Sequence, residues 1–139
     1  MRLVLLGVAA LSFCFVGHGH AAEIFGVWAA PSYEAHIEIE RCGQALCGKL
    51  IGSTGLKANP ALADTKNHDP ALRDRPLMGA LILTGFRGGP EKWQGGKIYN
   101  PQDGNVFAAS LELTSANSLT LKACLIAPFC QSQVWARVR

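Results

Sequence analysis

The chain has 139 residues, with 13 Lys and Arg against 10 Asp and Glu, and its net charge is +3. A charge this small argues against a surface built to bind nucleic acid or an anionic membrane. The length lies in the range of a single domain, and we therefore expect one small globular domain.

The first 21 residues have the composition of a signal peptide. Arg2 precedes an apolar stretch over 3–16 that is too short to span a bilayer comfortably, and Gly19-His20-Ala21 offers small residues where a signal peptidase cuts. We therefore expect a signal peptide over 1–21 and one exported domain over 22–139, periplasmic or secreted, with no transmembrane segment.

Four cysteines follow the predicted cleavage site, and an even number in an exported chain predicts disulfides. Of the three possible pairings we favour Cys42–Cys47 and Cys124–Cys130, because each pair flanks a short connection between strand-like segments. The alternative is a zinc site with four thiolates, which usually has two to four residues within each pair, whereas these pairs enclose four and five. We expect no metal.

Most of the remaining chain alternates between apolar and polar residues, as half-buried strands do. In 35–40, alanine and isoleucine occupy one face, and His36 lies beside two glutamates on the other. Gly95-Gly96 indicates a bulge, and Asn100 and Asp103 belong to a turn. The predicted strands are 24–30, 35–40, 48–52, a run from Ala80, 91–99, 107–113, 119–125 and 134–138.

The last strands have assignable faces. One apolar face of 119–125 runs from Leu119 to Leu125. The aliphatic face predicted to continue it on the final strand consists of Val134, Ala136 and Val138, with Trp135, Arg137 and Arg139 on the opposite face.

Residues 53–79 carry no strand pattern, and a loop of that length in a small domain is usually a lid, a binding loop or a flexible segment. Asp69-Pro70 predicts a short helical turn, because the carboxylate can cap the free amides and proline fits the first position. Ala80–Leu83 is continuously apolar, so a strand there needs cover on both sides. We expect that cover from Leu72, Leu77 or Met78.

Eight short strands without a long helix predict an all-β fold, either a sandwich or a closed barrel. We favour the eight-stranded antiparallel up-and-down barrel, with the long loop bearing its helical turn. Eight strands enclose enough room for side chains or for one small ligand.

Gly26-Val27-Trp28 resembles the short lipocalin signature at the start of the first strand. In lipocalin-like barrels a basic residue of the last strand covers that tryptophan, and the resemblance assigns this structural role to Arg137. Such a cation–π contact contributes about 0.5–2 kcal/mol.

A second resemblance covers essentially all of 22–139 and is to a bacterial family of secreted proteins known as domain of unknown function 2147. The residues that carry it are Cys42-Gly43, Leu46–Lys49, Asp69–Arg73, Arg75–Leu77, Gly79, Ile82-Leu83, Gly85-Phe86, Trp93, Gly95-Gly96, Ile98–Pro101, Asp103-Gly104, Cys124, Phe129-Cys130 and Trp135. The resemblance implies export to the periplasm and a lipocalin-like barrel, and it implies almost nothing about chemistry.

Four residues are candidates for ligand binding. Arg73 and Arg75 could hold a carboxylate or phosphate at the barrel mouth, or could instead pair with Asp69, Asp74 or a backbone carbonyl and fix the loop. Trp93 and Tyr99 could line a pocket with an apolar body and one polar group, or could simply pack in the core.

Motifs for catalysis are missing from the sequence: there is no Gly-x-Ser-x-Gly, no His-Glu-x-x-His and no phosphate-binding or dinucleotide loop. We therefore expect no cofactor. The first hypothesis is a protein that binds a small, partly apolar ligand, with an acidic head group if the arginines contact it. The second is a structural or interaction module of the envelope with a filled barrel. The third is an enzyme using Asp69, Arg73 and Asp103.

Overall fold

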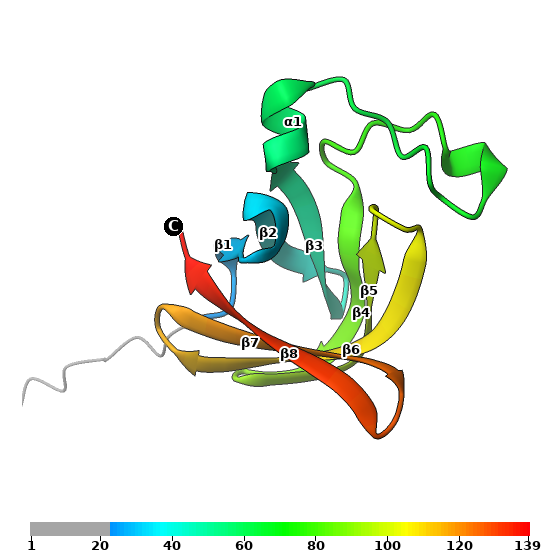
Figure 1. Cartoon of the computed structure of the whole chain (residues 1–139). Coiled ribbons are helices and arrows are strands. Elements are labelled where there is room, and N and C mark those ends of the chain that lie inside the picture. Colours follow the sequence, from blue (N-terminus) through cyan, green and yellow to red (C-terminus); the bar gives the residue numbers. More distant parts are fainter. Residues whose placement is uncertain (1–22) are drawn as a thin grey trace, which may run out of the picture.

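The computed structural model describes residues 23–139, and the predicted signal peptide lies outside them. Its eight strands close into a barrel in which each pairs with its sequence neighbours and the last with the first, all antiparallel (Figure 1). The strands are β1 Gly26–Ala30, β2 Ala35–Cys42, β3 Ala45–Gly52, β4 Leu81–Gly88, β5 Lys92–Asn100, β6 Asn105–Ser115, β7 Ser118–Ile126 and β8 Phe129–Arg137. The predicted eight-stranded up-and-down barrel is confirmed.

Three short helical segments accompany the barrel: η1 Ser32–Glu34, α1 Thr54–Ala58 and η2 Pro70–Leu72. The last is the predicted turn, and the Asp69 carboxylate accepts a hydrogen bond from the amide of Ala71 at 2.9 Å. Helix α1 was not predicted, and it begins where the Ser53 hydroxyl accepts a hydrogen bond from the amide of Leu56. Among residues 23–139, no helical segment has the length and hydropathy to cross a membrane.

The apolar run in β4 is buried for a different reason from the one expected. Its pairing with β3 slips between Gly48 and Lys49, so Ile82 and Leu83, although adjacent, are both buried. A bulge of this kind turns consecutive residues toward the same side. Leu77 is buried in the core, but Leu72 and Met78 stay exposed, so the cover expected from those two is not observed.

The buried and exposed faces of β8 are the reverse of the predicted ones. Trp135 is 2% exposed, whereas Val134 is 63% exposed. The register explains this, because Trp135 pairs with Leu119 of β7, which faces the core, and Val134 pairs with Thr120. Leu125 was expected on the core face of β7, and it lies near the end of that strand, largely exposed.

One end of the barrel, here called the base, is closed by Arg137. Its guanidinium carbon lies 4.3 Å from the centroid of the Trp28 ring, the contact implied by the lipocalin resemblance. The same group donates hydrogen bonds to the carbonyls of Ala116 at 2.6 Å and Phe25 at 2.8 Å, and to the carbonyl of Glu23. The base is therefore sealed by a charged side chain with several carbonyl partners.

The other end, here called the mouth, carries η1, the long loop and the β5–β6 and β7–β8 turns. In Figure 1 the loop over 53–79, drawn in green, extends beyond the ends of β3 and β4. Its two arms meet in an isolated bridge between Ala63 and Pro76, and the Leu77 amide donates to the Leu62 carbonyl at 2.9 Å. The loop is therefore a folded element.

Candidate functional site

A cavity of about 740 Å³ opens at the mouth of the barrel. Its wall is formed by apolar side chains that point inward from most of the strands, and the indole of Trp135 contributes to it. The principal apolar lining residues are Ile37, Leu50, Leu77, Ile82, Ile98, Phe107, Leu121, Ala123, Leu125, Phe129 and Trp135. A volume and a lining of this kind are typical of sites for one small organic molecule.

Polar groups also line the cavity, in the region of the β5–β6 turn and β8. They include Tyr99, Asn100 and Asp103 with Gln131 and Gln133. Asp103 is the only charged residue among the described residues of the lining. Its carboxylate accepts a bond from the amide of Asn105 at 2.9 Å, and the Asn100 side chain accepts one from Gln102, so both also build their turn.

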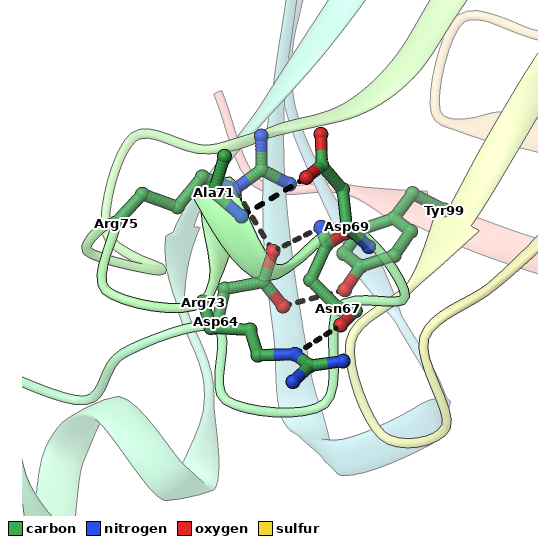
Figure 2. A network of polar contacts seen from close by, with 7 residues as sticks. All are labelled: Asp64, Asn67, Asp69, Ala71, Arg73, Arg75 and Tyr99. Atoms are coloured by element: carbon green, nitrogen blue, oxygen red, sulfur yellow. Dashed lines mark hydrogen bonds and ion pairs between the residues drawn. The ribbon is translucent and has the colours of Figure 1, made fainter.

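A buried carboxylate, that of Asp64, holds the loop against the barrel at this end (Figure 2). Asp64 is 1% exposed and is the only buried charged residue in the described part of the chain. One of its oxygens accepts the Tyr99 hydroxyl at 2.5 Å, and the other accepts the Asn67 amide and Arg75 Nε, each at 2.8 Å. Since Tyr99 belongs to β5, this carboxylate joins the loop to the strand that borders the cavity.

The electrostatics of this network follow from its hydrogen bonds. Burial by itself raises the pKa of the Asp64 carboxyl, but the bonds from Tyr99, Asn67 and Arg75 outweigh it and the net pKa is lowered. Burial and the bond to Asp64 raise the pKa of Tyr99 to about 12. The carboxylate is therefore ionised and the phenol neutral at neutral pH, which is the state that this network requires.

Neither predicted arginine lines the cavity. Arg75 Nε pairs with Asp64, and its guanidinium carbon lies 5.5 Å from the centroid of the Tyr99 ring. Arg73 Nε donates to the carbonyl of Asn67 at 2.8 Å. Both thus fix the loop, as the alternative in the sequence analysis expected: Arg73 binds a backbone carbonyl, whereas Arg75 pairs with Asp64 instead of Asp69 or Asp74.

The two predicted aromatic residues lie near opposite ends of β5. Tyr99 lines the cavity, while Trp93 does not. Trp93 packs edge-on to Phe25 with ring centroids 6.3 Å apart and donates to the carbonyl of Pro90. Six positions along a strand correspond to about 20 Å, so one pocket of this size does not hold both rings.

Gly104, in the β5–β6 turn, allows a second close approach between the loop and the barrel. Its φ is +77°, and a Cβ there would collide with the carbonyl of Lys66 in the loop. Only glycine satisfies both conditions. The loop is therefore held against the β5–β6 hairpin at two points, Asp64 and Gly104.

The four cysteines form the two predicted local disulfides, Cys42–Cys47 and Cys124–Cys130. Glu40 lies close to the first pair, but sulfurs joined to each other are not thiolate ligands. The alternative of a zinc site with four thiolates is therefore wrong.

Asp64 was missed by the sequence analysis, although it organises the mouth. It stands alone in a segment without periodicity, and its partner Tyr99 is 35 residues away. The arginines gave no signal for it either, because Asp69 and Asp74 lie closer to them in the sequence.

Comparisons with known proteins agree with this architecture. A search of curated proteins found no match. The fold is similar to a solved structure, protein HP1028 from Helicobacter pylori, described as belonging to the lipocalin family, with a TM-score of 0.76, 20% identity, and coverage of 86% of this chain and 85% of that one. A family model described as "Uncharacterized protein conserved in bacteria (DUF2147)" matches residues 26–137, from the first residue of β1 to the last of β8. The chain therefore belongs to this bacterial family.

Proposed function

We propose that the protein is exported and binds one small, partly apolar molecule in the barrel cavity. The observation that carries the proposal is the cavity of about 740 Å³, whose apolar wall stays open at the mouth. A structural module would gain stability by filling that space with side chains. The open interior therefore favours binding over the alternative of a filled barrel.

The head group of the ligand is neutral or cationic in this proposal. Among the described residues that line the cavity, Asp103 is the only charged one. Arg75 is already paired with Asp64. A carboxylate or phosphate would lose hydration without gaining a cation. The acidic head group considered from the sequence is therefore not supported, whereas hydroxyl, amide or amine groups fit the glutamines and Asp103.

Export is the second part of the proposal. The composition of residues 1–21 and the two disulfides support it, since disulfides persist in oxidising compartments such as the periplasm. Mass spectrometry of the protein recovered from periplasm should give a chain beginning at Ala22. A chain retained in the cytoplasm with residues 1–21 attached would contradict export while leaving the cavity proposal intact.

Binding is tested by native mass spectrometry of the periplasmic protein, followed by titration with decanol, decylamine and decanoate. We expect a bound small molecule, and decanoate binding weaker than decanol by about tenfold because its charge must be desolvated. No bound molecule and no binding of any of the three probes would contradict the proposal.

A pair of neighbouring substitutions locates the site. Ala123 lines the cavity, and Lys122, the preceding residue of β7, is exposed on the outer side. Ala123→Phe should fill the cavity and weaken decanol binding by about tenfold or more, whereas Lys122→Phe should change it less than about twofold. Equal effects of the two would place binding outside the barrel.

A further inference from the structure

The tip of the β7–β8 hairpin, residues 125–129, is apolar and exposed. The large side chains of Leu125, Ile126 and Phe129 are 75%, 71% and 75% exposed, and the tip contains no charged residue. The disulfide Cys124–Cys130 joins β7 and β8 at the point where the tip begins. Single exposed hydrophobic residues are ordinary on protein surfaces, but three large ones on one five-residue tip mark a contact site.

This tip borders the mouth of the cavity. Leu125 and Phe129 belong to the cavity lining as well as to the exposed tip, whereas Ile126 is not part of the lining. Figure 1 shows the tip, in orange to red, projecting on the side away from the long loop. Whatever covers the tip therefore lies next to the cavity entrance.

The surface behind the tip is basic. Lys122 lies two residues before Cys124 on the same face of β7. Lys97 of β5 pairs with Ala108 of β6, which in turn pairs with Cys124, so Lys97 lies two strands away from Cys124. Both lysines are exposed. Within the strands β5, β6, β7 and β8 the only acidic residue is Glu112, which lies farther from the tip and within 4.0 Å of Lys92. Asp103, in the turn between β5 and β6, belongs to the cavity lining.

We propose that this hairpin tip docks on the surface of a phospholipid bilayer that contains anionic lipid. Apolar side chains enter the interfacial region, while Lys97 and Lys122 lie against the lipid phosphates. The net charge of the whole chain gives no reason to expect this contact, because the attraction is local to one hairpin. The biological role of this contact rests on the proposed function, because docking would place the mouth of an apolar cavity at the membrane surface.

A second copy or another protein fits the tip less well. A stable protein interface buries about 1,000 Å² or more in total, and a narrow projecting tip with three large side chains offers a small part of that area. Insertion into lipid needs no matching surface. The shape of the tip therefore favours a bilayer.

The test measures cosedimentation with vesicles of phosphatidylethanolamine and phosphatidylglycerol at 3:1, with phosphatidylcholine vesicles for comparison. All variants are made in the same exported chain, so the difference between variants is independent of the residues before β1. We expect the native protein to bind the mixed vesicles and Ile126→Ser to weaken partitioning by about tenfold. Lys122→Gln should weaken it by about fivefold, on the anionic vesicles only.

The matched control is Val134→Ser, because Val134 is 63% exposed on the outer side of β8 and lies away from the tip. It should leave partitioning unchanged. Absent vesicle binding, equal losses for Ile126→Ser and Val134→Ser, or a dimer that Ile126→Ser dissociates would each overturn the proposal. Decanol binding by Ile126→Ser is measured in parallel, since its persistence while vesicle binding fails separates this proposal from the proposed function.

Discussion

The two ends of the barrel are closed by opposite means. At the base, Arg137 of β8 donates to three backbone carbonyls and covers Trp28, so a cation joins segments that are already fixed by strand pairing. At the mouth, the buried Asp64 carboxylate receives three side-chain donors and attaches a long loop to β5. We therefore expect changes at the base to alter the stability of the whole barrel, and changes at the mouth to loosen the loop while the barrel stays folded.

Removing Arg137 should have the largest effect. Arg137→Ala deletes the cation–π contact and the carbonyl bonds, and we expect the free energy of unfolding to fall by about 3 kcal/mol. Urea denaturation measures this, with Arg139→Ala as a control that should cost less than about 0.5 kcal/mol. A small loss for Arg137→Ala would show that the base is closed by the strands alone.

Asp64→Asn should act on the mouth. It leaves Arg75 without its carboxylate, and we expect the loop to lose about 2 kcal/mol of local stability. Hydrogen exchange at the loop amides of Asp64, Asn67 and Leu77 should then speed up by about 30-fold, while β2 and β7 amides exchange as before. The control is Asp74→Asn, which changes an exposed acid of the same loop.

Two glycines with the same backbone conformation isolate the second contact at the mouth. Gly104 and Gly79 have φ values of +77° and +81°, but only at Gly104 would a Cβ meet the Lys66 carbonyl. Gly79→Ala should cost about 1 kcal/mol for its backbone conformation, and Gly104→Ala about 1 kcal/mol more. Equal midpoints in urea would show that the loop does not rest on the β5–β6 turn.

The pH dependence gives the smallest and most local effect. Because the folded pKa of Asp64 lies below its ordinary value of 3.8, its contribution is complete above that value and is lost as the pH falls through the folded value. The pKa of Tyr99 is raised from 10.0 to about 12, so its contribution is complete below pH 10 and is lost as the pH rises toward 12. The stability difference between native protein and Asp64→Asn should therefore be constant from about pH 5 to 9 and shrink outside those limits. A difference that changes between pH 5 and 9 would contradict this assignment.

The strands and the disulfides were predictable because alternation, turn residues and cysteine spacing are local signals. The facing of Trp135 was not, since it depends on the register with Leu119 across the β7–β8 hairpin. The partner of Arg75 was also beyond the sequence, because Asp64 lies in an irregular segment and competes with closer acids in the chain. Local patterns thus predict the barrel wall, while long-range pairing determines what closes its ends.

The indole protons of the three tryptophans test the central claim most directly. Trp135 lines the cavity and donates to Gln133, whereas Trp28 donates to Ile24 at the closed base and Trp93 to Pro90. Titration with decanol should shift the indole NMR signal of Trp135 and leave that of Trp28 in place. A Trp135 signal that stays still at saturation, or a Trp28 signal that moves as far, would contradict a barrel open at one end only.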